Sequence, residues 1–285
     1  MSVGKIDSST NYSYVTFKVT KSRIDKGLLA IPKSLAYEYF PDHNSEIQIS
    51  SIESDRFEAK NYTSFKSSSR EARIGGMRAW YYKNKISDGD EVVIQVIDRE
   101  NLKYKILPER QFLNKIQQLQ ESFDKAADEV DAANRLSVIS SITGVDKNKA
   151  AFHEALRLVQ ATVQARKHSS ENIRKSKEKI PASLKSLLGE IYQGHCQLTD
   201  FSFIMKNCKP YFEVHHINPN ISNHIKNLLV VCPNIHAQFT YANVYLRFDN
   251  EGWLHKVKLN ETEFTVIQKI RDYHKKAKFD KHVYS

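Results

Sequence analysis

The chain has 285 residues, of which 40% are hydrophobic and 27% are charged, and this composition excludes a disordered or low-complexity protein. Its 9 glycines and 7 prolines exclude collagen-like and linker-dominated architectures. The 43 Lys and Arg residues outnumber the 33 Asp and Glu residues, and the resulting formal net charge of +10 suggests a polyanionic partner.

Cysteine content and hydropathy bear on the compartment. The chain has three cysteines, Cys196, Cys208 and Cys232. This number is small and odd, so the cysteines do not predict a disulfide framework. The sequence shows no apolar run long enough to span a membrane, and its first 20 residues lack the basic-then-apolar order of a signal peptide. We therefore expect a soluble, cytoplasmic protein with no membrane partner.

Residues 14–107 are predicted to be rich in β-structure. Turn signals such as Asp25-Lys26-Gly27 separate short apolar or alternating runs. A helix is expected at residues 33–40, because Pro32 precedes it and Pro41 follows it. The expected strands are residues 14–19, 28–31, 46–52, 56–60, 92–97 and 104–107. Short strands at this spacing predict a barrel or a sandwich.

The pattern changes at Pro108 to that of a helical region. Apolar residues recur at alternating steps of four and three, which is typical of a coiled coil or a tightly packed helix pair. They are Phe112, Ile116, Leu119, Phe123, Ala126, Val130 and Ala133. A break at Thr143-Gly144 and a second stripe at residues 152–163 favour an antiparallel helical hairpin. The seam packs either within this hairpin or across a dimer interface.

A basic stretch at residues 166–179 and a helix at about 181–191 lead into a mixed C-terminal part. There we expect strands at residues 211–217 and 228–232, a helix at 235–241, a hairpin at 245–257 and a terminal helix from about 261. The sequence thus predicts an α+β protein in three parts, residues 1–107, 108–190 and 191–285.

The segment FKVTKSRIDKGLLAIPKSLAYEYFP, followed later by GGMRAWYYKNKISDGDEVVIQV, resembles the B3-like DNA-binding fold of plant transcription factors and of some restriction endonucleases. The resemblance covers about residues 14–105 and rests on the order of a VTKS turn, an LxIPK strand end, Trp80 and a DGDEV turn. It implies a β pseudobarrel that grips the major groove of double-stranded DNA with two loops, at about residues 20–26 and 60–73.

Both loops combine basic side chains with hydroxyl and other polar groups, a mixture that can hold phosphates and donate to base edges. The candidate DNA-binding residues are Lys21, Ser22, Arg23, Lys26, Tyr62, Thr63, Lys66, Ser67, Ser69, Arg70 and Arg73. An isolated basic run is more often solvated surface. Here the two basic runs coincide with the two loops that the resemblance implies for DNA binding. Between residues 60 and 85 there are seven basic residues and one acidic residue, Glu71.

The sequences FEVHHINP (residues 212–219) and NLLVVCPNIHAQF (residues 227–239) resemble the HNH nuclease motif, a ββα-metal fold. By this resemblance His216 is the general base, His215 and His236 hold one divalent cation, and Asn227 bridges the loop and orients His216. Glu213 shares a strand face with His215, so it either orients His215 or ligates the metal.

The chemistry of these groups suits phosphodiester hydrolysis. An imidazole can accept a proton from water near neutral pH, and a cation can neutralise charge on the phosphate. Imidazole ligands with open positions accept several divalent ions, and Mg²⁺ is expected, with Mn²⁺ as a substitute.

A structural zinc, which many HNH proteins hold with two C-x-x-C pairs, is not expected here. The corresponding places read Cys196-x-x-Thr199 and Cys232-x-x-Ile235, so each pair lacks its second thiol. A Cys₃His set that adds Cys208 and either His195 or His224 would have irregular spacing. Cys196 and Cys232 are therefore predicted to be small buried hydrophobic residues.

These features together predict a sequence-specific restriction endonuclease, located in a bacterial or archaeal cytoplasm, that hydrolyses phosphodiester bonds of double-stranded DNA. One HNH site cuts one strand, so a double-strand break implies a homodimer, and the host would need a cognate DNA methyltransferase. Two alternatives stay open. One is a nuclease that depends on DNA modification and has a pocket for a flipped base; the other is a non-catalytic DNA-binding regulator.

Overall fold

The computed structural model describes residues 3–6, 12–51, 54–66, 71–164 and 179–283. The chain divides into two compact units, Met1–Gln118 and Leu119–Ser285, and the border lies inside helix α4 (Glu109–Asp124). Among the described residues no helix is long and apolar enough to cross a membrane.

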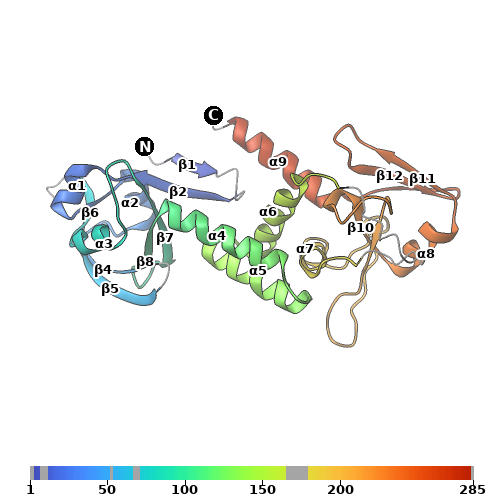
Figure 1. The fold of residues 1–285 in the computed structure, drawn as a ribbon, viewed down its shortest axis with the longest axis horizontal. Helices are drawn as coiled ribbons and strands as arrows, with labels where there is room; N and C mark the ends of the chain where they lie inside the picture. Colours follow the sequence, from blue (N-terminus) through green and yellow to red (C-terminus); the bar gives the residue numbers. More distant parts are fainter. Residues whose placement is uncertain (1–2, 7–11, 52–53, 67–70, 165–178, 284–285) are drawn as a thin grey trace. The chain divides into compact units, whose positions relative to one another are not determined.

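Within its described residues, the N-terminal unit holds one eight-stranded sheet that curls into a half-barrel (Figure 1). The strand order is β1-β2-β7-β8-β4-β5-β6-β3, and only β4 and β8 pair in parallel. The strands are β1 (Val3–Ile6), β2 (Ser13–Lys18), β3 (Leu29–Ile31), β4 (Ser45–Ser51), β5 (Ser54–Thr63), β6 (Ala72–Ile74), β7 (Glu91–Asp98) and β8 (Lys103–Pro108). All six strands predicted for this region are confirmed.

Three short helices interrupt the strands: α1 (Lys21–Lys26), α2 (Lys33–Tyr39) and α3 (Arg78–Lys83). Helix α2 lies where it was predicted, between two prolines. The loop expected at residues 20–26 is instead helix α1. Its first turn closes on the Thr20 carbonyl, and Gly27 ends it in the left-handed conformation with φ of 66°.

Aromatic side chains form much of the half-barrel core. The Phe40 ring, at the end of α2, stacks on Tyr104 with a centroid separation of 4.3 Å and on Tyr62 at 5.1 Å. The Tyr104 hydroxyl donates to the carbonyl of Tyr39 at 2.7 Å, so the buried phenol is satisfied. This stack joins α2 to strands from two parts of the sheet.

Phe40→Ala should therefore lower the free energy of unfolding by about 3–5 kcal/mol, because it leaves a cavity between two buried rings. Urea unfolding followed by circular dichroism measures the change. Tyr82→Ala, which removes a side chain that is 89% exposed, is the control and should change stability by less than about 0.5 kcal/mol. Equal losses for the two variants would contradict this packing.

In the C-terminal unit, helices α5 (Glu129–Thr143), α6 (Lys147–Val159) and α7 (Ala182–Tyr192) pack against one another. The apolar seam of residues 112–133 predicted one continuous helix, and this is wrong, because α4 ends at Asp124 and α5 begins at Glu129. Asp128 caps α5 by accepting from the backbone N–H groups of Val130 and Asp131, and Val130 is 56% exposed. The predicted break at Gly144 is confirmed, and the basic stretch at 166–178 lies outside the described residues.

Next in the chain comes a ββα unit. Strands β9 (Glu213–His216) and β10 (Leu228–Val231) pair antiparallel, with His216 opposite Leu228, and helix α8 (Pro233–Tyr241) packs on β9. A short 3₁₀ helix, η1 (Ile225–Asn227), immediately precedes β10. The two strands and the helix lie where the sequence predicted them.

A three-stranded antiparallel sheet and a last helix complete the unit (Figure 1). They are β11 (Val244–Phe248), β12 (Leu254–Leu259), β13 (Thr262–Thr265) and α9 (Lys269–Val283). The terminal helix begins later than the predicted residue 261, because residues 262–265 pair with β12. Cys196 and Cys232 are buried among the apolar residues of this unit, as predicted, whereas Cys208 is exposed.

Candidate active site and nucleic-acid interface

The alternation of side chains along β9 sorts the predicted catalytic residues onto two faces. Glu213 and His215 share the face on which α8 packs, and α8 supplies His236. The His215 and His236 rings lie 5.3 Å apart between centroids, at 73° to each other, and His215 also stacks on Phe239 at 4.2 Å. Two of the three histidines thus meet between the strand and the helix.

Glu213 connects the strand to the helix. Its Oε2 is bound to Nδ1 of His236, and its Oε1 accepts a hydrogen bond from the Tyr211 hydroxyl at 2.8 Å. The sequence predicted that Glu213 orients His215 or ligates the metal, and it did not predict the contact of Glu213 with His236 that the structure shows. Because Nδ1 of His236 contacts Glu213, Nε2 is the ring nitrogen with which His236 would bind a metal ion.

Whether these residues suit a metal ion depends on the chemistry of the donor atoms of His215 and His236. Neutral imidazole nitrogens of His215 and His236 suit a divalent ion with open positions, and a carboxylate that orients one of the rings is a usual companion of such a pair. The described residues contain no group of three or more His, Cys, Asp or Glu side chains arranged to hold a metal ion. Water and substrate oxygens would therefore have to complete the coordination.

His216 lies on the opposite face of β9 and contacts Asn223. Its Nε2 is 2.9 Å from Oδ1 of Asn223, whose amide nitrogen donates to the carbonyl of Lys179 at 3.0 Å. With the amide oxygen as acceptor, Nε2 carries the proton and the basic lone pair is on Nδ1. The sequence reading missed Asn223, because no motif marks a residue inside the loop between the two strands.

Asn227 holds the loop that follows His216. Its Oδ1 accepts from the backbone N–H of Asn218 at 2.8 Å, and its Nδ2 donates to the carbonyls of Asn218 and Ile221 at 3.0 and 3.1 Å. The side chain is buried, so these hydrogen bonds are shielded from water. Asn227 therefore connects the chain just before β10 to the chain just after β9.

All three histidines line one cavity of about 860 Å³. Its other walls include Lys179, the first residues of α7 and the first residues of α5. Lys185, on α7, forms an ion pair of 2.6 Å with Glu129 of α5. The cavity is thus lined by basic and imidazole groups together with the carboxylates of Asp128 and Glu129.

The predicted DNA-binding residues of the half-barrel fall into several classes. Four of them lie on α1 and are exposed or half-buried: Lys21, Ser22, Arg23 and Lys26. Thr63, the last residue of β5, and Arg73, the central residue of β6, are half-buried. Tyr62 is a correction: its side chain is 2% exposed and belongs to the aromatic core, so it is not a surface contact. Ser67, Ser69 and Arg70 lie outside the described residues.

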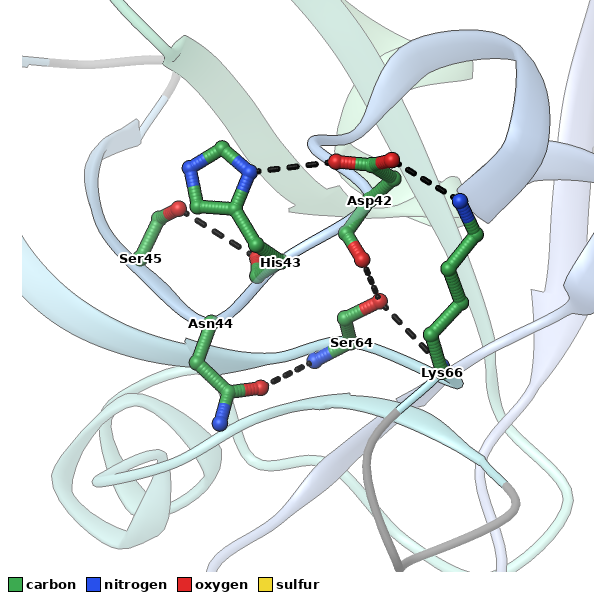
Figure 2. A network of polar contacts seen from close by, with 6 residues as sticks. All are labelled: Asp42, His43, Asn44, Ser45, Ser64 and Lys66. Atoms are coloured by element: carbon green, nitrogen blue, oxygen red, sulfur yellow. Dashed lines mark hydrogen bonds and ion pairs between the residues drawn. The ribbon is translucent and has the colours of Figure 1, made fainter.

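Lys66 is held by a polar network at the base of the second predicted loop. Its Nζ lies 2.8 Å from Oδ2 of Asp42. Ser64 donates to the Asp42 carbonyl, and Asn44 accepts from the Ser64 N–H (Figure 2). Hydrogen bonds from Lys66 and His43 lower the pKa of Asp42 to about 2, so the ion pair stays charged at neutral pH. Lys66 is therefore partly neutralised before any phosphate approaches.

A second cavity, of about 790 Å³, lies between β2 and β3, two strands that do not pair in the sheet. Lys18 and Thr20 line it from β2 and its end, Ala30 lines it from β3, and Arg23 and Glu71 also border it. Nη2 of Arg23 is bound to Oε2 of Glu71, so one residue from each predicted loop meets here.

Comparison with known structures finds likeness in the N-terminal third of the chain. An Arabidopsis FUS3–DNA complex is 12% identical and matches 33% of this chain and 92% of that one, with a TM-score of 0.28. An Arabidopsis thaliana transcription factor LEC2–DNA complex is 19% identical, over 33% and 88%, with a TM-score of 0.28. The N-terminal domain of Helicobacter pylori LlaJI.R1 is 14% identical, over 35% and 88%, with a TM-score of 0.27. No protein-family model matches the chain, and no curated protein matches it.

Proposed function

We propose that the chain is a sequence-specific DNA endonuclease of the restriction type. The observation that supports this proposal is that His215, His216 and His236 all border one cavity, beside a loop that Asn227 holds. Residues 1–107 would read duplex DNA, residues 108–190 would connect, and residues 191–285 would cut.

In this proposal His216 is the general base. Asn223 fixes its Nε2–H, so Nδ1 takes the proton from the attacking water. His215 and His236 would hold a divalent cation, Mg²⁺ or Mn²⁺, and Glu213 orients His236 for that task. When bound, such a cation neutralises charge on the phosphate and on the leaving oxygen.

The half-barrel supports the reading role through its surface. Exposed Lys21 and Lys26 on α1 supply positive charge beside the cavity that Arg23 borders. Binding energy from such a reader would place a particular phosphate in a catalytic unit that has little selectivity of its own. Because one catalytic site cuts one strand, the proposal includes a homodimer on double-stranded DNA and a cognate methyltransferase in the host.

His216→Ala should lower the rate of plasmid cleavage by about 100-fold or more, because the attacking water loses its base. The assay follows conversion of supercoiled DNA at low salt with Mg²⁺ or Mn²⁺, and filter binding should show unchanged DNA affinity. His195→Ala is the control, since His195 lies outside the cavity and contacts Asp200.

Three results would count against the assignment. Unchanged cleavage by His216→Ala would remove the general base. Cleavage of methylated DNA alone would indicate a nuclease that depends on modification, and no cleavage of either DNA by the wild type would indicate a non-catalytic regulator.

Asn227→Asp should slow cleavage while leaving DNA affinity unchanged. The carboxylate cannot donate to the carbonyls of Asn218 and Ile221, so the loop beside His216 loses its anchor. Burial of the unpaired groups should also lower the free energy of unfolding by about 1–3 kcal/mol. Single-turnover kinetics and urea unfolding measure the two effects. Asn234→Asp, an exposed site on α8, should change neither, and a loss of affinity with Asn227→Asp would contradict the positioning role.

Lys21→Ala with Lys26→Ala should weaken DNA binding across all sequences, because the helix no longer neutralises phosphates. The slope of log affinity against log salt is negative, and its magnitude should decrease by about 0.9 for each phosphate that a removed lysine had neutralised. Fluorescence anisotropy with one duplex at several salt concentrations gives the slope. Lys125→Ala, an exposed change between α4 and α5, should leave the slope unchanged. If the double variant keeps the wild-type slope, α1 does not bind phosphates.

A further inference from the structure

Glu71 is an acid where the chain is otherwise strongly basic. It is the one acidic residue between Lys60 and Lys85, a segment with seven basic residues. Its carboxylate binds the Arg23 guanidinium, and the two side chains remain 34% and 30% exposed. The pair thus joins the two predicted DNA loops and stays accessible to a ligand.

The pair borders the cavity of about 790 Å³ at the unpaired seam between β2 and β3. Val19, Leu29 and Ile31, which are buried core residues, contribute apolar parts of its wall. Packing of these residues fixes the backbone on both sides of the seam. A polar pair on such a rigid border can present donors and acceptors in a constant arrangement.

Electrostatics opposes a carboxylate on a surface that binds DNA, because phosphates repel it. The repulsion is offset where the carboxylate accepts a hydrogen bond from a base, and in the major groove the cytosine N4 amino group is the donor that Glu and Asp accept from. A guanidinium has five N–H donors. Arg23 can therefore bind Glu71 through Nη2 and still direct other N–H groups at O6 and N7 of guanine.

We propose that Arg23 and Glu71 together read one C·G base pair, with Glu71 as the residue that sets the preference for cytosine. This inference rests on the proposed function, since it assumes that the half-barrel binds duplex DNA. A different role, in which the ion pair only ties the two loops together, makes a different prediction. If the ion pair only connects the two loops, its loss would weaken the base preference equally at every position of the recognised sequence. If Glu71 contacts a base, its loss would weaken the preference at one position.

The test is selection of bound DNA from a randomised duplex pool by the full chain, with EDTA present so that no DNA is cut. The wild type should select a sequence that contains an essential C·G pair. Glu71→Gln should lose the preference for cytosine at that one position by about tenfold, with the other positions retained. Glu58→Gln is the control, because it removes an acid that is ion-paired with Lys60 on β5 and does not border the cavity.

Glu71→Asp is the second variant: it keeps the charge but withdraws the carboxylate by one methylene, and it should weaken the same position only. Circular dichroism confirms that each variant folds. An unchanged consensus in both variants, or uniform weakening of all positions, would overturn the inference while leaving the proposed function in place. If the wild type itself selects no sequence, the proposed function fails and the inference falls with it.

Discussion

The pairing of β9 with β10 is the constraint on which the candidate active site depends. Because side chains alternate along a strand, the register that sets His216 opposite Leu228 also sends Glu213 and His215 to the α8 side and His216 to the other. Asn227 stands immediately before β10, and its side chain holds the intervening loop by hydrogen bonds to Asn218 and Ile221. A shift of register by one residue would exchange the two faces and separate the histidines from their partners.

In the half-barrel the constraint is electrostatic: acidic side chains pair with basic side chains and reduce their attraction for a polyanion. Arg23 is bound to Glu71 and Lys66 to Asp42, so two of the predicted DNA-binding cations are partly neutralised by carboxylates. A count of the basic residues alone would therefore overstate the attraction available at this surface. Basic side chains that are ion-paired with carboxylates bind polyanions less strongly, but their orientation is better defined. Such pairing favours specificity for one DNA sequence over affinity for DNA in general.

Agreement between sequence and structure is best where local signals are strong. Six of the eight described strands of the half-barrel, the proline-bounded α2 and the ββα unit lie where alternation and turn residues predicted them. The failures share a cause, which is competition from contacts that the local pattern does not contain. Asp128 caps a new helix inside an apparent heptad seam, and residues 262–265 add to a sheet edge although their pattern resembles a helix start. Tyr62 has a polar tip that suggested a surface contact, but stacking on Phe40 buries it.

By itself the sequence determined the α+β class and the order of most elements, and it marked the histidines and Asn227 as candidate site residues, because these depend on periodicity, turn residues and short motifs. Only the tertiary structure decided which groups meet. Glu213 contacts His236, Asn223 binds His216, and Glu71 joins Arg23 across 48 positions of the chain. Such pairs form when separate strands and helices pack together, and no spacing along the chain encodes the hydrogen-bond geometry that results.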